Sequence, residues 1–269
     1  MSLEARLAPY IALWNLQPEG AAFETHSNTL QPVRFEGRAA MLKLIKYEDE
    51  EQGPAALAYF AGEGAVELLA RMGWAHITAR ASGGANLEEV FRADDDAAFG
   101  VVCDTLARLH APRAAPAPKS LIPMRRRFRA LFAQRGRSSV YEQAAQIAER
   151  LIAVPQNEGV LHGDVNPTNI VWDAARGWLA IDPKGLYGER AYDYAYALMN
   201  PVELAIKPGR LERLARIVST RTGIPFRRLL DYAAASAALS TIWRIEDGHP
   251  DADSRGVEWA LDALARNAA

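Results

Sequence analysis

The 269-residue chain has a single cysteine and no long hydrophobic run. Cys103 has no partner for an internal disulfide, which suits a reducing compartment. No stretch of about 18 apolar residues is present, so the sequence excludes a conventional membrane span. The N-terminal residues lack the basic segment and apolar core of a secretory signal. We therefore expect a cytoplasmic globular protein with no membrane partner.

The sequence also has no excess of charge of either sign. Lys and Arg total 31 against 33 Asp and Glu, a net charge of −2, so no overall field attracts nucleic acid or anionic lipid. The one basic cluster, Arg125 to Arg129, is spread around several faces of a predicted helix, which favours contacts with water or neighbouring acids. His26, His76 and His249 share no spacing typical of a metal site. We expect no nucleic-acid partner, and a monomer or a weak homodimer.

Strand-like segments are concentrated before residue 81, and helical patterns follow it. An amphipathic helix at 3–16 precedes a predicted hairpin with strands 31–35 and 39–45, and a short helix at 54–60 precedes two strands. After residue 84 apolar residues recur at helical spacing in eight segments, 87–91, 97–110, 125–134, 141–152, 192–199, 209–222, 226–248 and 257–268. The pattern predicts an α+β fold with a small antiparallel-sheet lobe at 1–81, a mostly helical lobe at 82–269 and a ligand cleft between them.

Residues with chemical potential are concentrated in two short segments, 160–172 and 178–184. In the first, apolar residues flank a loop with four polar side chains, His162, Asp164, Asn166 and Asn169. In the second, an apolar run ends at Asp182. Two short strands joined by the turn at 173–177 would return the chain to its starting point, so we expect Asp182 beside Asn169. An amide and a carboxylate oxygen suit Mg²⁺, and Asp164 is then free to accept the proton of an attacking hydroxyl.

A base in a His-x-Asp loop, an Asn five residues later and an Asp after a hairpin form the layout of a kinase active site. Three alternatives compete with this interpretation. The polar residues are turn formers and could make only a hydrogen-bonded turn, although turn chemistry does not predict the apolar flanks or the second acid. A nucleotide-binding pseudokinase of the same fold would retain the core residues without transferring phosphate. A metal-dependent hydrolase could use His162, Asp164 and Asp182 as ligands, but no further histidine is predictably placed nearby.

The motifs resemble those of a known family. The segment 162–170, His-Gly-Asp-Val-Asn-Pro-Thr-Asn-Ile, resembles the catalytic loop of aminoglycoside phosphotransferases, which have a bilobal protein-kinase-like fold. The segments 180–185 and 189–193 are similar to the streptomycin 6-kinase branch, also described as aminoglycoside/hydroxyurea resistance kinases. Segments 62–66 and 242–248 also resemble that branch. The resemblance implies an ATP- and Mg²⁺-dependent kinase for a hydroxyl of a small molecule, such as the aminoglycoside streptomycin, with a role in antibiotic resistance.

The resemblance also implies roles for individual residues. Asp164 would be the catalytic base, Asn169 and Asp182 the magnesium ligands, and Lys43 the lysine that reaches the ATP phosphates, paired with a helix carboxylate that is either Glu50 or Glu51. A solvent-facing Lys43 is the alternative, because strand alternation does not decide its side. The loop covering the phosphates would be 26–29, with Ser27, Asn28 and Thr29, and adenine would contact the connection at Ala79 and Ala81. A simple polar turn at 26–29 is the alternative.

The acceptor is predicted to be a small molecule. Asp193 follows Asp182 by only eleven residues, which leaves no room for the long segment with which protein kinases hold a peptide. The resemblance implies that Asp193 braces the catalytic loop. Acids are dense from Glu246 to Asp253, where they would attract a cationic sugar or form a solvated loop. We predict acceptor contacts at Asn166, Glu246 and Asp247. The identity of the phosphorylated hydroxyl stays open.

Overall fold

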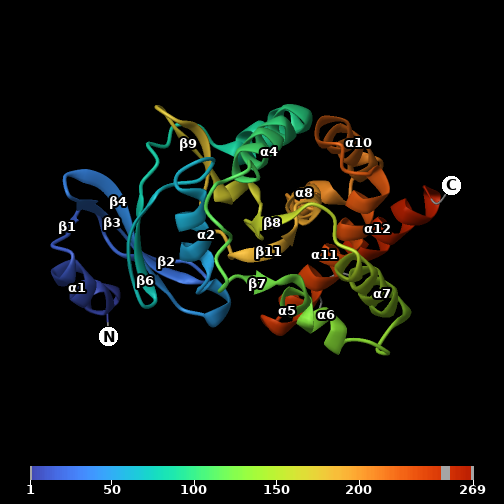
Figure 1. The fold of residues 1–269 in the computed structure, drawn as a ribbon, viewed down its shortest axis with the longest axis horizontal. Helices are drawn as coiled ribbons and strands as arrows, with labels where there is room; N and C mark the ends of the chain where they lie inside the picture. Colours follow the sequence, from blue (N-terminus) through green and yellow to red (C-terminus); the bar gives the residue numbers. More distant parts are fainter. Residues whose placement is uncertain (1, 250–254, 268–269) are drawn as a thin grey trace.

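The computed structural model describes residues 2–249 and 255–267, apart from the side chains of Val202 and Glu203. Figure 1 shows a strand-rich part on the left, at the N-terminal end, and a helical part on the right. The N-terminal strands form one antiparallel sheet in the order β1-β3-β4-β6-β5, with β2 pairing with β3. Its strands are β1 (Gln17–Pro18), β2 (Phe23–Glu24), β3 (Asn28–Phe35), β4 (Arg38–Ile45), β5 (Leu68–Met72) and β6 (Ala75–Ala79).

The predicted hairpin forms the centre of this sheet. Phe35 faces Arg38 across a two-residue turn in which Glu36 and Gly37 both have positive φ, the turn geometry that matches the twist of a hairpin. Helix α1 (Leu3–Leu13) packs on one face of the sheet through the buried Leu7. The other face receives the 3₁₀ turn η1 (Glu48–Glu50) and α2 (Gly53–Phe60), which join it to the rest of the molecule.

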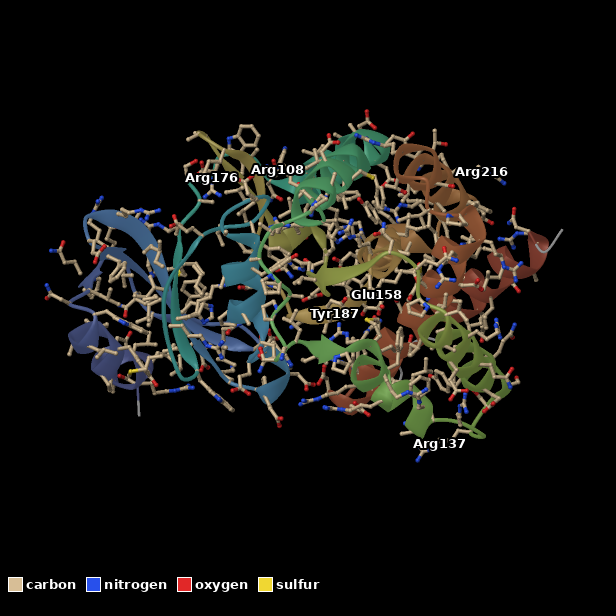
Figure 2. All side chains as sticks on the ribbon, viewed as in Figure 1. Arg108, Arg137, Glu158, Arg176, Tyr187 and Arg216 are labelled. Atoms are coloured by element: carbon tan, nitrogen blue, oxygen red, sulfur yellow. The ribbon has the colours of Figure 1, made fainter. Side chains whose placement is uncertain are left out.

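Two small sheets lie between the N-terminal sheet and the helices. The hairpin β9 (Ile170–Asp173) and β10 (Gly177–Ala180) follows the turn η2 (Pro167–Asn169). Strands β7 (Ile122–Pro123), β11 (Leu186–Glu189) and β8 (Glu158–Leu161) form a second sheet that the sequence patterns did not predict, because its strands are only two to four residues long. Arg108 donates to the Trp178 carbonyl at 3.0 Å and Arg176 to the Ala65 carbonyl at 3.0 Å, at the top of Figure 2, so the turn end of the hairpin is anchored to α4 and to the segment before β5.

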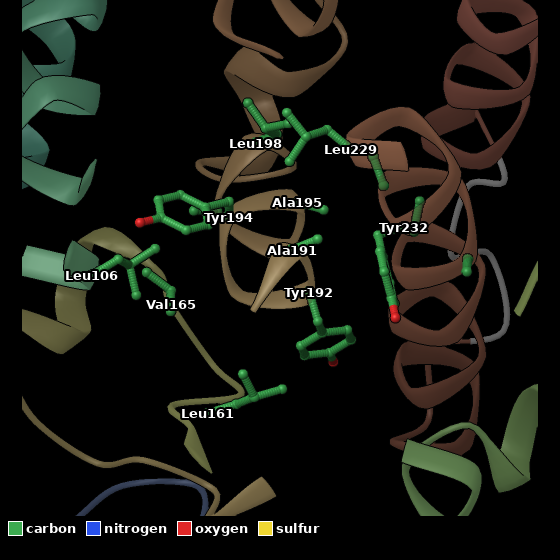
Figure 3. Close-up of a cluster of buried hydrophobic side chains, with 14 of the residues drawn as sticks. Leu106, Leu161, Val165, Ala191, Tyr192, Tyr194, Ala195, Leu198, Leu229 and Tyr232 are labelled. Carbon is green, nitrogen blue, oxygen red and sulfur yellow. The ribbon is translucent and has the colours of Figure 1, made fainter. Parts of the chain in front are cut away.

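The helical part is built around two central helices. Its elements are α3 (Leu87–Ala93), α4 (Asp95–Leu109), α5 (Met124–Arg127), α6 (Arg129–Ala133), α7 (Ser139–Ala153), α8 (Ala191–Leu198), α9 (Val202–Ala205), α10 (Arg210–Thr222), α11 (Phe226–Glu246) and α12 (Arg255–Arg266). Figure 3 shows α8 and α11 meeting through Tyr192 and Tyr232, whose rings form an edge contact at 6.1 Å. Leu161, just before the polar loop, and Val165, within it, pack into the same core and so tie that loop to α8.

Most predicted elements are confirmed, with boundary shifts. The predicted helix at 125–134 is two short helices that meet at Phe128, and the strand predicted at 65–71 begins at Leu68 because Ala65 and Val66 bond to β10 instead. Cys103 is buried in α4, where it packs as a core residue. Within the described residues, no helix combines the length and apolar character needed to cross a bilayer.

Candidate active site

The polar loop after β8 is held by its own histidine. The Asp164 amide donates to Nδ1 of His162 at 3.2 Å, and Nε2 of His162 lies 2.8 Å from the Ile181 carbonyl, to which it donates. Burial lowers the pKa of His162 below its usual value, so the ring is neutral at physiological pH. Because both ring nitrogens are occupied, His162 positions the loop and is unavailable as a base or a metal ligand.

Asp193 holds the same loop through its backbone amides. From the first turn of α8 its carboxylate accepts hydrogen bonds from the amides of His162 at 2.9 Å and Gly163 at 2.8 Å. Nε2 of His110 lies 2.9 Å from the same carboxylate and donates to it. Burial alone would raise the pKa of Asp193, but these donors and the neighbouring histidines hold it below its usual value. The predicted bracing role of Asp193 is confirmed by these contacts.

Asp164 is surrounded by groups that favour its charged form. Lys184 Nζ lies 3.7 Å from its carboxylate, and the Tyr196 hydroxyl and the Arg127 guanidinium are close enough to stabilise its charge. Burial would raise the pKa of Asp164, but Lys184, Arg127 and His162 hold it below its usual value. The carboxylate is therefore ionised at neutral pH. A weak base of this kind suits phosphoryl transfer, in which orienting the attacking hydroxyl matters more than early proton removal.

The hairpin brings the two expected metal ligands together. β9 pairs with β10 as the predicted hairpin, and the Ile181 amide donates to the Asn169 carbonyl at 2.9 Å, which places Asp182 next to Asn169. The Asn169 amide nitrogen donates to the backbone carbonyl of Asp164 at 3.0 Å, so its oxygen is the atom left for a metal. Asp182 has φ +56°, a conformation that aspartate tolerates better than most residues. One amide and one carboxylate oxygen fit Mg²⁺, which takes its remaining ligands from phosphates and water.

The pairing predicted for Lys43 is wrong in its partner. Lys43 is buried on β4, which rules out a solvent-facing lysine, but its ammonium pairs with Asp182 rather than with Glu50 or Glu51. Pro54 lies in the first turn of α2, so this helix begins at Gly53, and both glutamates precede it. Glu50 lies in η1 and pairs with Lys184, whereas Glu51 is half-buried and contributes its backbone carbonyl to Arg71. Burial lowers the pKa of Lys43 to about 7, although nearby Glu50 opposes the shift.

The predicted phosphate-covering loop lies at the site, but not all its side chains face it. Ser27 lines a cavity together with Asp164, and Asn28 lines a small space with Asp182. Thr29 instead is fully buried at the start of β3 and donates its hydroxyl to Glu24 at 3.2 Å. A phosphate contact through the Thr29 hydroxyl is therefore not supported, because this side chain is buried within the N-terminal, strand-rich part of the molecule.

The connection after β6 is only partly available to a nucleotide base. The Ala79 amide donates to the Glu67 carbonyl at 2.8 Å within the sheet, so it is not free for adenine. The chain then crosses to the hairpin of β9 and β10, called the catalytic hairpin below, where the Ser82 amide donates to the Asp173 carboxylate at 3.1 Å. Ala81 lies between these anchors, and its adenine contact stays a prediction.

Asp164 opens onto a large cavity lined by residues of both the strand-rich and the helical part. This cavity, of about 840 Å³, is lined by the predicted acceptor residues Glu246 and Asp247 at the end of α11. A second cavity of about 590 Å³ adjoins it and shares Tyr196, Trp243 and Asp247 with it. Asp251 and Asp253 of the acidic segment lie outside the described residues. The side-chain oxygen of Asn166 accepts from the amides of Thr168 and Asn169 and so caps η2, while its Nδ2 donates to the Asp164 carboxylate at 3.3 Å. Its acceptor contact stays a prediction.

Sequence patterns missed three contributors to this site, the cations Arg127 and Lys184 and the aromatic Trp243. Arg127 is half-buried, stacks 4.2 Å from the centre of the Trp243 ring and donates to the Gly163 carbonyl at 2.9 Å. Arg126 and Arg129 in the same cluster pair with the acids Glu48 and Asp49, as expected for a basic cluster on a helix surface. Lys184 is the third contributor, and its position directly after the apolar run that ends at Asp182 was the only available signal.

The comparisons with known proteins agree with this geometry. Residues 13–248 match the sequence model of the aminoglycoside/hydroxyurea antibiotic resistance kinases. The chain is 40% identical over 260 residues to streptomycin 3''-kinase of Klebsiella pneumoniae, covering 94% of this chain and 97% of that protein. It is 28% identical over 264 residues to streptomycin 6-kinase of Streptomyces griseus, covering 91% and 84%.

The fold also has a solved counterpart. A crystal structure of aminoglycoside phosphotransferase APH(4)-Ia with ADP and hygromycin B superposes with a TM-score of 0.64 at 16% identity, covering 97% of this chain and 98% of that one. At that identity the likeness concerns the fold alone, and it confirms the kinase-like α+β prediction.

Proposed function

Because the chain belongs to the aminoglycoside/hydroxyurea antibiotic resistance kinase family, we propose that it transfers the γ-phosphate of ATP to the 3''-hydroxyl of streptomycin. The resemblance read from the catalytic segments is thereby confirmed at the level of the family and of an ATP-dependent small-molecule kinase. The choice of the 3'' position over the 6 position follows the higher identity to the streptomycin 3''-kinase, 40% against 28%. It refines the 6-kinase likeness suggested by the motifs.

One observation supports a guanidinium-bearing acceptor. The carboxylates of Glu246 and Asp247 line the same cavity as the base Asp164, and the adjoining cavity extends it past Trp243. Streptomycin carries guanidinium groups on a ring separate from the sugar with the 3''-hydroxyl. A multi-ring cation can therefore place one ring at Asp164 and its charge at the acids. Carboxylates and guanidinium groups form strong, geometrically specific pairs.

The residues divide the reaction between them. ATP would lie between the sheet and the catalytic hairpin, with Lys43 and the 26–28 loop toward its phosphates. Asn169 and Asp182 would hold Mg²⁺, which would offset the negative charge of the phosphates. Asp164 accepts a hydrogen bond from the acceptor hydroxyl and takes its proton as the new P–O bond forms, while the bond to the departing ADP breaks.

Neither rival interpretation gains support. The described residues hold no group of three or more His, Cys, Asp or Glu side chains arranged to bind a metal, and His162 uses both ring nitrogens within the loop. This removes the basis for the hydrolase. A pseudokinase would require the loss of a core residue, but Lys43, Asp164, Asn169 and Asp182 are all present and adjacent.

A product analysis tests the proposal. Purified protein with ATP, MgCl₂ and streptomycin should release ADP, and phosphorus–proton correlation NMR should place the new phosphate on the 3'' carbon. Hygromycin B and hydroxyurea serve as comparison acceptors, and Asp164→Asn as the inactive control. Phosphate on the 6 carbon would overturn the regiochemistry, and turnover only with hydroxyurea would overturn the aminoglycoside acceptor.

A further inference from the structure

The short acidic turn η1 faces three cations of the helical part. Glu48 pairs with Arg126 at 2.9 Å, Asp49 with Arg129 at 3.2 Å, and Glu50 with Lys184. The first two pairs are largely exposed, with 71% of the Glu48 side chain accessible, whereas only 10% of the Glu50 side chain is. Exposed ion pairs contribute little to stability and are screened by salt. The mostly buried pair Glu50–Lys184 is therefore the strongest of the three contacts between η1 and the helical part.

Lys184 contacts more than Glu50. Its ammonium also lies 3.7 Å from the carboxylate of Asp164, and it lines the cavity onto which Asp164 opens. A single cation thus touches one carboxylate from the strand-rich part and the catalytic carboxylate from the loop. Lys43 does not compete for Glu50, because it pairs with Asp182.

Two glycines make this arrangement possible. The segment 182–185 passes so close to the start of α2 that a Cβ on Gly53 would lie 2.2 Å from the Pro183 carbonyl oxygen. A Cβ on Gly185, which has φ +69°, would lie 2.2 Å from the Gln52 carbonyl oxygen. Real side chains do not fit at such distances, so the backbones can meet only because both residues are glycine. This close approach delivers Lys184 to Glu50.

From this geometry we propose that Lys184 is a positioning residue for phosphoryl transfer, whose ammonium holds Asp164 in its reactive orientation while Glu50 holds the ammonium. The inference rests on the proposed function, because it assigns Asp164 as the base. Lys184 acts through Asp164 and need not touch ATP or the acceptor. Its loss should therefore affect the chemical step more than the binding of either substrate.

The principal test separates kcat from KM. Lys184→Met should lower kcat about 30- to 100-fold, because small misplacements of a catalytic group have effects of that order, and should change the KM values for ATP and streptomycin by less than about threefold. Lys184→Arg retains the charge and should recover most of the loss. Glu48→Gln, which removes an exposed pair of the same turn, is the matched control and should leave kcat unchanged.

A double-mutant cycle tests the link through Glu50. Glu50→Gln alone should lower kcat about three- to tenfold, and adding it to Lys184→Met should produce no further loss, because both act through one ammonium. Independent multiplication of the two effects would overturn the proposal. So would a kcat of Lys184→Met within about twofold of the wild type, or a selective rise in the KM for ATP, which would make Lys184 a nucleotide ligand.

Failure of the proposed function would be visible separately. Wild-type protein that does not phosphorylate streptomycin overturns the acceptor before any variant is compared. The same variants can then be compared by their release of inorganic phosphate from ATP, which needs no acceptor other than water. Thermal unfolding of each variant establishes that it is folded at the assay temperature.

Discussion

Replacing Asp193 by asparagine tests how far the catalytic loop depends on one buried carboxylate. The carboxylate accepts three hydrogen bonds, two from loop amides and one from His110. Asparagine can accept at only one of its two terminal atoms. If its oxygen keeps the His162 amide and His110, its NH₂ group faces the Gly163 amide, donor against donor. One charge-assisted bond is lost, and two buried donors are left unsatisfied.

The structure allows the cost to be estimated. Each buried unsatisfied group costs about 1–3 kcal/mol, and the remaining bonds lose their ionic character, so we expect a loss of about 3–5 kcal/mol in the free energy of unfolding. For a chain of this size that corresponds to a fall of about 8 °C in the Tm. A loop displaced by about 1 Å would lower kcat about 100-fold. Circular dichroism during heating and initial-rate kinetics measure the two quantities.

The contribution of Asp193 to stability should decrease at low pH. The pKa of Asp193 in the folded protein lies below its ordinary value of 3.8, so its contribution to stability is present above about pH 4 and is lost as the pH falls through the folded value. The difference in Tm between wild type and Asp193→Asn should narrow below pH 4. Asp104→Asn, an exposed acid on α4, is the control. A variant within about 1 °C of wild type with normal kcat would refute the bracing argument.

Three further predictions concern the reaction itself. Asp164→Asn should lower kcat by about 10³-fold or more while ATP still raises the Tm, and a normal rate in this variant would remove Asp164 as the base. Chelation of divalent ions should abolish turnover until MgCl₂ is restored, and Asn169→Ala should raise the MgCl₂ concentration needed for half-maximal rate; an unchanged requirement would remove Asn169 as a ligand. Glu246→Gln and Asp247→Asn should each raise the KM for streptomycin about three- to tenfold in low salt with an unchanged KM for ATP, since both residues are exposed and a lost surface pair costs about 1 kcal/mol. Equal effects on both substrates would place these acids outside the acceptor site.

Local sequence patterns were sufficient to predict contacts between residues where the chain folds back on itself within a few residues. The apolar runs on either side of the turn at 173–177 predicted the hairpin, and the hairpin alone places Asp182 beside Asn169. The helical pattern at 192–199 likewise placed Asp193 at the start of a helix, and the family resemblance supplied its bracing role. These contacts depend on turn chemistry and strand register, which are written in consecutive residues.

Contacts between distant segments were decided by the tertiary structure. Glu50 and Lys184 are separated by 134 residues, and their pairing follows from the close approach of two backbones at Gly53 and Gly185. Periodicity could not reveal that approach, so it could not show that Lys43 pairs with Asp182 instead. Arg127 illustrates the same limit, because a basic cluster reads as solvated until Trp243 of α11 is seen to cover one of its members.

The sequence by itself identified the groups proposed to carry the chemistry, since Asp164, Asn169 and Asp182 are recognisable from their order and apolar flanks. It left open the side of the strand on which Lys43 lies. The tertiary structure decided the pairing of charges and the shape of the acceptor cavity. The physical reason is that residue type and local spacing encode which groups are available. Which carboxylate a given ammonium meets depends on how closely two parts of the fold can pack.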